Sequence, residues 1–224
     1  MTGVATTTEV PSDRGIARWA GLGGLLYVVL LIVGAILLFD GPTGDEAPAK
    51  YFAYYGQHGH RGRAGVGWVI AMLGVLCLIW FISRLRDVVA GYGMPFLSSV
   101  VFVGGTVYAS MTAVALSIRM GTATMSDDTF HHVVFPGVIH GASDAAYVTH
   151  AAGAVGATSF IVAASLAALR ARRIPAWAGW LGVALGIIGL FSIVFFPMLA
   201  IAIWLVVASV LLVRMPAGAP AASS

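Results

Sequence analysis

The sequence predicts an all-α, polytopic membrane protein: a bundle of six transmembrane helices with both termini in the cytoplasm. Three observations predict this. Of the 224 residues, 59% are hydrophobic and 9% are charged, whereas soluble domains carry about 25% charged residues. The chain also contains six mostly apolar blocks whose length suits a hydrocarbon layer of about 30 Å. Finally, the basic residues between the blocks alternate between a richer and a poorer side.

The six predicted spans are 20–39, 65–82, 97–118, 145–169, 177–195 and 198–213. Only Phe196 and Pro197 separate the last two. A single helix over 177–213 would be about 55 Å long, too long for one crossing. Since proline disfavours helix in the residue before it, a hairpin near Pro197 is predicted. The spans form one domain over 16–214, between disordered tails at 1–15 and 215–224.

The basic residues predict the orientation of the bundle. Eight arginines share one side: Arg14, Arg18, Arg84, Arg86, Arg170, Arg172, Arg173 and Arg214. Four basic residues share the other: Lys50, Arg61, Arg63 and Arg119. The richer side is assigned to the cytoplasm. The excess of arginine, alanine, glycine and valine hints at a GC-rich bacterial gene, and the predicted location is the bacterial plasma (inner) membrane.

The segments 40–64 and 119–144 then face outward, and they carry five of the six histidines. The sixth, His150, lies a little over one turn inside the outer end of the fourth span. In the first segment, Tyr51, Phe52, Tyr54 and Tyr55 follow Pro48 and predict a short interfacial helix whose rings anchor it among the lipid headgroups. His58 and His60 follow it and are interpreted as solvated loop residues.

Two predicted helices carry polar stripes at helical spacing. The third span has Ser99, Thr106, Ser110 and Ser117, and the fourth has His140, Ser143, Asp144, Tyr147, His150, Thr158 and Ser165. Because lipid offers such side chains no partners, they are expected to face the bundle interior or a wet cavity. They are either hydrogen-bonding links between the third and fourth spans or the wall of an outward-opening pocket. The predicted pocket residues are Tyr147, His150, Asp144, Ser143, Thr106 and Ser110.

Histidine and aspartate gather in the second outer segment. Asp127 with His131, Asp128 with His132, and His140 with Asp144 are spaced to meet on one helical turn. This composition suits Zn, Cu or Fe, and the candidate ligands are His131, His132, His140, His150 and Asp144. No H-E-x-x-H or C-x-x-C motif is present. Haem held by two histidines is not expected, because a single histidine lies within a predicted span. No cofactor is assigned.

Small residues mark close helix contacts, above all Gly182 and Gly186 in the fifth span. Packing within the chain is the favoured interpretation, and a homo-oligomer or another membrane subunit bound through these glycines is the alternative. The lipid bilayer is the expected partner. Nucleic acid is not, because the basic residues form no patch or stripe.

Two short stretches resemble a known family. They are residues 173–182, Arg-Ile-Pro-Ala-Trp-Ala-Gly-Trp-Leu-Gly, and the pair Trp80-Phe81 followed by Leu85-Arg86. They are similar to a six-span, mostly actinobacterial membrane protein family of unknown function. The resemblance implies a six-span layout and no particular activity.

The favoured functional hypothesis is a non-catalytic binding, sensing or partner subunit with an outward-facing polar pocket between the third and fourth spans. One alternative is a metal-dependent membrane enzyme that uses the histidine and aspartate set. The other is an outward-facing pH sensor, since histidine gains its charge near pH 6.

Overall fold

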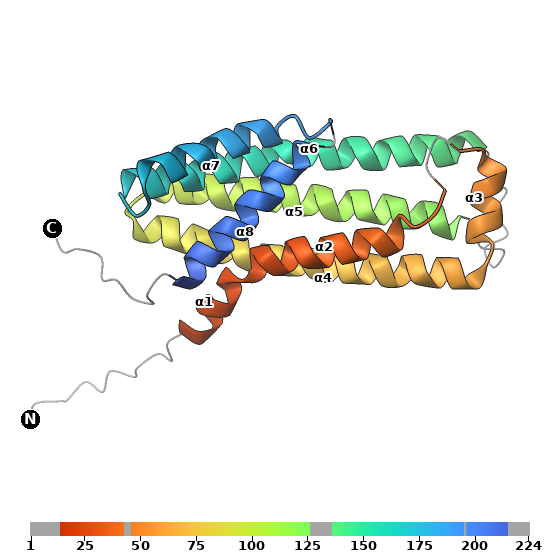
Figure 1. The fold of residues 1–224 in the computed structure, drawn as a ribbon, viewed down its shortest axis with the longest axis horizontal. Coiled ribbons are helices and arrows are strands. Elements are labelled where there is room, and N and C mark those ends of the chain that lie inside the picture. The colour runs from red at the N-terminus through yellow and green to blue at the C-terminus, as the bar shows by residue number, and fades with distance from the viewer. Residues whose placement is uncertain (1–13, 43–45, 126–135, 195, 215–224) are drawn as a thin grey trace, which may run out of the picture.

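The structure, a computed structural model, describes residues 14–42, 46–125, 136–194 and 196–214. These residues form eight α-helices and no strand. The helices are α1 (Arg14–Gly21), α2 (Gly23–Leu38), α3 (Pro48–Tyr55), α4 (His58–Gly91), α5 (Pro95–Thr124), α6 (Pro136–Arg170), α7 (Ala176–Gly189) and α8 (Met198–Arg214). Figure 1 shows one elongated bundle. We call the end crossed by α3 the α3 end. The opposite end, where α1 begins and α8 ends, is the basic end.

Three helices are long and apolar enough to cross a membrane: α4, α5 and residues 137–170 of α6. They contain the predicted spans 65–82, 97–118 and 145–169. The helices have 34, 30 and 35 residues, which corresponds to about 45–52 Å at 1.5 Å per residue. Much of the two predicted outer segments is therefore helical, because α4, α5 and α6 continue beyond their apolar blocks toward the α3 end.

The other three predicted spans correspond to the shorter apolar helices α2, α7 and α8. Helices α7 and α8 form a hairpin whose turn lies part-way along α6 (Figure 1). α8 begins directly after Pro197, but α7 ends at Gly189 and not at residue 195 as predicted. Backbone bonds from Leu190, Phe191 and Ser192 to the residues three positions earlier tighten the chain into turns there. The hairpin connection is therefore longer than the position of Pro197 alone indicates.

Helix α1 precedes the first apolar helix and was not expected. It includes Arg14, Ile16, Arg18 and Trp19, and the side chains of Ile16 and Trp19 are exposed. Apolar and basic residues within two turns suit a helix lying along a membrane surface. The predicted tails lie outside the described residues, apart from Arg14 and Gly15.

Close backbone contacts hold the long helices together. A Cβ atom on Gly156 of α6 would lie 2.5 Å from the carbonyl oxygen of Gly104 in α5, and one on Gly34 of α2 would lie 2.6 Å from the carbonyl oxygen of Gly67 in α4. Only glycine permits these contacts, through which helices in lipid gain dispersion energy and weak hydrogen bonds. The order α2–α4–α5–α6 across the bundle follows from these pairs.

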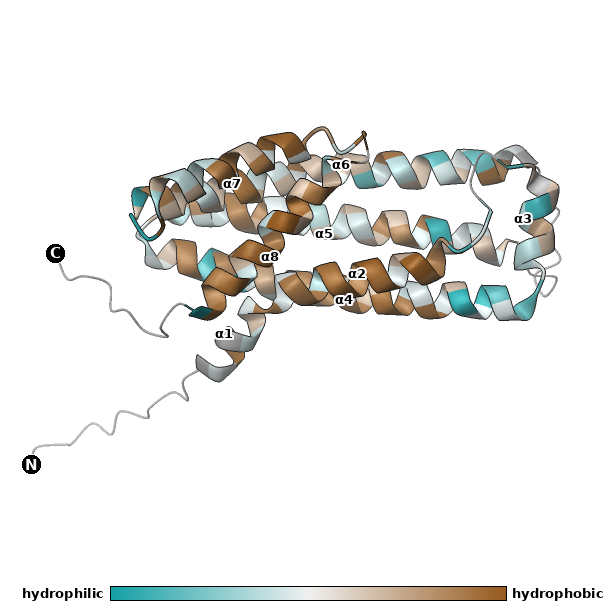
Figure 2. Ribbon diagram, in the orientation of Figure 1, coloured by the Kyte–Doolittle hydropathy of each residue, from teal (hydrophilic) through white to brown (hydrophobic). Residues whose placement is uncertain are grey.

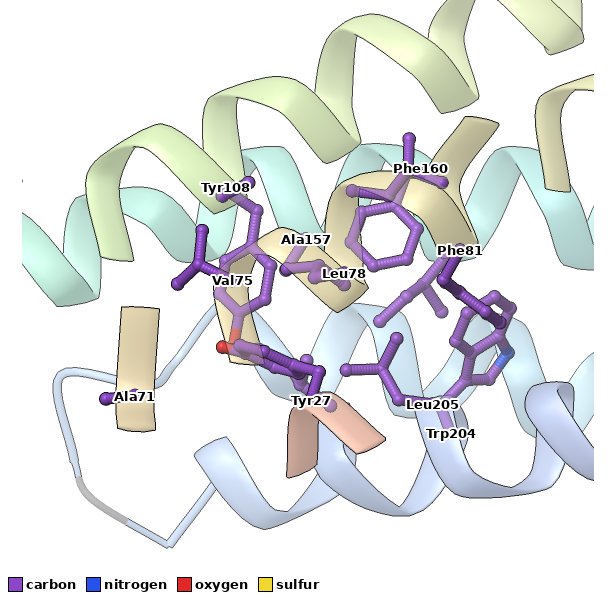
Figure 3. Packing of buried hydrophobic residues seen from close by; sticks show 14 of the residues in the cluster. Tyr27, Ala71, Val75, Leu78, Phe81, Tyr108, Ala157, Phe160, Trp204 and Leu205 are labelled. Carbon is purple, nitrogen blue, oxygen red and sulfur yellow. The ribbon is translucent and has the colours of Figure 1, made fainter. Parts of the chain in front are cut away.

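The centre of the bundle is built from aromatic and aliphatic side chains of five helices (Figure 3). Phe81, Phe160 and Trp204 pack at right angles or near it, with the ring centroids of Phe160 and Trp204 5.6 Å apart. Apolar side chains also cover the outside of α2, α7, α8 and much of α4, whereas hydrophilic residues gather at the α3 end (Figure 2). A bundle that is apolar inside and outside matches a lipid environment.

Candidate functional site

Helix α3 closes one end of the bundle (Figure 1). Tyr51 and Tyr55 are both 1% exposed, so these two rings point into the protein. The hydroxyl groups of Tyr51 and Thr122 lie 2.8 Å apart, and Tyr54 donates to the carbonyl oxygen of Asp40. The expectation of an aromatic anchor among headgroups is therefore wrong for Tyr51 and Tyr55. Their rings cover the interior instead, because a short helix lying across the bundle end presents one face inward.

Arg119 lies beneath this cap and is 7% exposed. Its guanidinium donates to the hydroxyl of Ser143 at 3.3 Å and to the carbonyl oxygen of Pro42 at 3.5 Å. Both bonds are longer than the usual N–H···O distance of about 2.9 Å. The guanidinium carbon also lies 5.1 Å from the centre of the Phe39 ring and 5.8 Å from that of Tyr51. Four segments of the chain thus surround one cation.

The charge of Arg119 is not neutralised within the described part of the chain. Its Nε–H has no hydrogen-bond partner. The printed ion pairs of the described residues join Lys50 to Glu46 and Arg63 to Asp40, and none reaches Arg119. A guanidinium has five N–H donors, and only two are used here. The burial of an unpaired cation costs free energy, so a bound anion would offset part of this cost.

Two further buried polar atoms have no partner among the described residues. They are the indole Nε1 of Trp68 in α4 and the hydroxyl of Thr112 in α5. Trp68 and Thr112 lie about 15 Å and 18 Å from the α3 ends of their helices. Buried polar groups are usually satisfied. The Thr112 hydroxyl lies beside those of Tyr27 and Tyr108, so the unused hydrogen-bonding capacity is that of the Trp68 indole.

A third polar group lies near the centre of the bundle. Tyr27 of α2 donates its hydroxyl to that of Tyr108 in α5 at 3.0 Å, and both rings are buried (Figure 3). The ring of His150 in α6 meets the Tyr108 ring at a centroid distance of 6.3 Å. His150, a predicted pocket residue, is therefore next to a buried tyrosine pair.

The predicted stripe on α5 faces the other way. Thr106 and Ser110 are exposed, as are Ser99 and Ser117, so they do not face the bundle interior, and the alternative of a wet cavity stays a prediction. Thr106 donates to the carbonyl oxygen of Phe102, and Ser99 to that of Pro95, each four residues earlier. Because its own helix satisfies such a hydroxyl, the stripe needs no partner from another helix.

The predicted stripe on α6 connects to several elements. Ser143 accepts from Arg119, and Tyr147 donates to the carbonyl oxygen of Ile193. Thr158 donates to the carbonyl oxygen of Gly186 at 2.8 Å, and Ser165 accepts from the Trp204 indole at 3.2 Å. Three of these four links run to the α7–α8 hairpin, and the one from Ser143 to Arg119 runs to α5. Asp144 is exposed.

The histidines are separated in space. His140 and His150 lie ten residues apart on one continuous helix, which is about 15 Å along the axis. Ligands of one ion must converge within about 4 Å of one another, so these two cannot share a metal. No group of three potential ligands lies together in the described residues. His131 and His132 lie outside them, so a metal held by these two with His140 and Asp144 stays a prediction.

The remaining histidines belong to the α3 end. His58 receives a hydrogen bond from Arg61 at 3.1 Å, and the His60 ring stacks on Tyr54 at a centroid distance of 3.8 Å. Both lie in the first turn of α4. Neither residue lies in a loop, so the interpretation of the two as solvated loop residues is wrong on this point. His60 is also packed against the ring of Tyr54.

The fifth-span glycines are covered within the chain. A Cβ atom on Gly182 would lie 2.4 Å from the Ser165 hydroxyl, and one on Gly186 would lie 3.0 Å from Ile161 and Val162. Both glycines thus pack against α6, and this surface is not open to a second copy.

Sequence reasoning missed Arg119, Thr112 and Tyr108 as members of one buried face of α5. A signal was present, since these residues are spaced by four and seven positions, as residues on one helical face are. The sequence prediction instead used the small hydroxyl residues on the opposite face of α5.

Comparison with known proteins finds no matching family model, no matching curated protein and no matching solved structure. The similarity carried by residues 173–182 stays a prediction. The function proposed below therefore depends on the geometry and charge of the site.

Proposed function

We propose that this protein is a six-span membrane protein of the plasma membrane, with the basic end in the cytoplasm, that binds a small oxyanion at its α3 end. It acts as a non-catalytic binding or sensing subunit. The observation that carries the proposal is the buried guanidinium of Arg119, which no carboxylate of the described residues neutralises.

The helix lengths support this placement. α2, α7 and α8 have 16, 14 and 17 residues, about 21–26 Å each. With tilt and the adjoining turns, each suits one crossing of a thin hydrocarbon layer. The much longer α4, α5 and α6 then project past the membrane on the α3 side. Arg119, near the far end of α5, lies in this projecting part.

The surroundings of Arg119 favour a carboxylate or phosphate group. The planar guanidinium binds such oxyanions with two parallel hydrogen bonds. Here the unused Nε–H and the remaining Nη protons are available. The Ser143 hydroxyl, 3.3 Å from the guanidinium, adds a polar group to the site, and the rings of Phe39 and Tyr51 limit access by water. An anion entering this site would gain strong hydrogen bonds at low dielectric.

Thermal unfolding of the protein purified in a neutral detergent tests the proposal. The unfolding temperature, followed by tryptophan fluorescence, is measured in chloride, acetate and phosphate at constant ionic strength. We expect acetate or phosphate to raise it by several degrees in the wild type, because a ligand that binds only the folded state stabilises it. In Arg119→Gln the increase should vanish.

The anion-free comparison adds a second measure. Loss of an unneutralised buried charge should leave the unfolding temperature of Arg119→Gln equal to that of the wild type or above it. Arg63→Gln is the matched control, since Arg63 is half-exposed and pairs with Asp40. It should keep the anion response. Neither anion stabilising the wild type, or an equal response in Arg119→Gln, would overturn the proposal.

A further inference from the structure

A cavity lies at the basic end, away from Arg119. It has a volume of about 240 Å³ and lies between α4, α6, α7 and α8. Trp177 and Leu181 of α7, Ile203 and Trp204 of α8, and Val88 of α4 contribute to its wall. In Figure 1, α8 runs obliquely across the bundle. The cavity lies between residues of α8 and those of the other three helices.

The wall of this cavity is apolar. The Ser165 hydroxyl and the Trp204 indole nitrogen, which belong to lining residues, bond to each other. The remaining wall is mostly aliphatic and aromatic, so the cavity suits hydrocarbon. Since a water molecule occupies about 30 Å³ of liquid, the volume corresponds to about eight groups of that size. This is enough for part of one acyl chain.

Positive charge surrounds the cavity on its basic side. Tyr92 lines the cavity, and the guanidinium carbon of Arg173 lies 5.9 Å from the centre of its ring. Burial raises the pKa of Tyr92, while the charges of Arg173 and Arg84 act in the opposite direction. Arg84 lies one helical turn before Val88, a cavity-lining residue of α4. Among the described residues from 84 to 92 and from 170 to 176, Asp87 is the one carboxylate against five arginines.

We propose that this cavity binds one acyl chain of an anionic phospholipid whose phosphate lies between Arg84 and Arg173. The lipid and the site are complementary along their length. The acyl chain would lie against the apolar wall, and the negatively charged phosphate would lie against the two arginines at the rim. Basic pockets between transmembrane helices on the cytoplasmic side are suited to anionic headgroups. The site is independent of Arg119.

Quenching of tryptophan fluorescence by brominated lipids tests this proposal. Phosphatidylglycerol and phosphatidylcholine with identical brominated acyl chains are titrated into the detergent-purified protein. Trp204 is 8% exposed, so a chain quenches it by entering the cavity. We expect at least a roughly five-fold preference for phosphatidylglycerol, about the contribution of one basic residue at an anionic headgroup. Trp204→Phe should remove the part of this quenching that comes from Trp204, while Trp177, which also lines the cavity, should keep its own part.

The paired variants separate a specific site from general surface charge. Arg84→Gln/Arg173→Gln should quench equally with both lipids, whereas Arg172→Gln/Arg214→Gln, with the same change in charge, should keep the preference. Ala168→Leu, which narrows the cavity, should reduce the quenching while the circular dichroism spectrum stays unchanged. Equal quenching of the wild type by both lipids would overturn the proposal, as would equal behaviour of the two double variants.

Discussion

Arg119 is a single residue that contacts four segments of the chain. Its contacts come from Phe39 at the end of α2, Pro42 in the following turn, Tyr51 in α3 and Ser143 in α6. Two of these contacts are long hydrogen bonds, which an entering anion would compete with or shorten. Occupancy of the site would therefore change the contacts of Arg119 with α6 and with the connection between α2 and α3. This is the physical basis on which a binding site here would serve a sensor.

Tyr55 gives a residue-scale prediction at the same end of the protein. Burial raises the pKa of Tyr55 to about 12, the neighbouring Tyr51 also raises it, and Arg119 opposes the shift. Between pH 10 and pH 12 the unfolded chain releases this proton while the folded protein keeps it. The free energy of unfolding should therefore fall as the pH rises through this range.

The absorbance of tyrosinate checks this prediction. The difference between the wild type and Tyr55→Phe should show a titration midpoint near 12 and not near 10. Tyr55→Phe should also lose part of the stability decrease between pH 10 and pH 12. A midpoint at 10 would show that the Tyr55 ring is solvated, and α3 would then not cover the bundle end as the structure shows.

At the scale of elements, α6 organises the bundle. Its glycine and alanine positions pack against α5, and its hydroxyl groups link it to the α7–α8 hairpin through Thr158 and Ser165. Backbone contact with α5 and hydrogen bonds to the α7–α8 hairpin hold this helix, and its buried Phe160 and Ile161 add apolar packing. In lipid, where no hydrophobic effect drives helices together, these are the available forces.

Two glycines of α6 allow a matched test of this packing. A Cβ atom on Gly156 would lie 2.5 Å from the Gly104 carbonyl oxygen, whereas one on Gly141 would meet nothing within 4 Å. Gly156→Ala should therefore lower the stability by about 1–3 kcal/mol, as overpacking does. Gly141→Ala should be neutral or stabilising by up to about 1 kcal/mol, because alanine favours helix.

Thermal unfolding in detergent measures both variants. A lower unfolding temperature for Gly156→Ala together with an unchanged or higher one for Gly141→Ala is the expected pair of results. If both alanines act alike, the α5–α6 contact is not as close as described, and the hydroxyl groups and buried apolar side chains of α6 would hold it instead.

At the scale of the whole molecule, the mismatch between short and long helices supports the proposed placement in the membrane. α2, α7 and α8 suit one thin hydrocarbon layer, and α4, α5 and α6 exceed it. All three short helices reach toward the basic end, so the excess length of the long ones lies at the α3 end (Figure 1). The polar residues in Figure 2 gather at that same end.

Cysteine labelling tests the orientation. Cys77 is the one cysteine of the chain, so Cys77→Ala provides the background. Gly59 and Gly91 are exposed glycines near opposite ends of α4, and a Cβ atom on either meets nothing within 4 Å. With a membrane-impermeant maleimide, Gly59→Cys should react in intact cells and Gly91→Cys only after permeabilisation. The opposite pattern would reverse the orientation.

A third cysteine addresses the number of spans. Val194 is exposed in the connection between α7 and α8. If both helices cross the membrane, Val194→Cys should react from outside in intact cells. If it reacts only after permeabilisation, the hairpin enters from the basic side and returns without crossing, and the protein has four spans.

The apolar blocks and the arginine distribution were sufficient to predict an all-helical membrane protein and the location of its six apolar helices. Length and hydropathy are properties of contiguous residues, so local sequence carries them. For the same reason, the break between the last two apolar helices could be predicted from Pro197 and from the length of a continuous helix. The earlier end of α7 at Gly189 could not, because the turns over residues 190–192 lie within the same apolar block.

The direction in which polar residues face was decided only by the tertiary structure. Thr106 and Ser110 share the helical spacing of a buried stripe, yet they are exposed, and Arg119 at the end of an apolar block is buried. Spacing shows which residues share a face of a helix, but not which neighbour that face meets. That choice depends on glycine contacts between distant segments, such as Gly104 with Gly156, and on α3 closing over the end of the bundle.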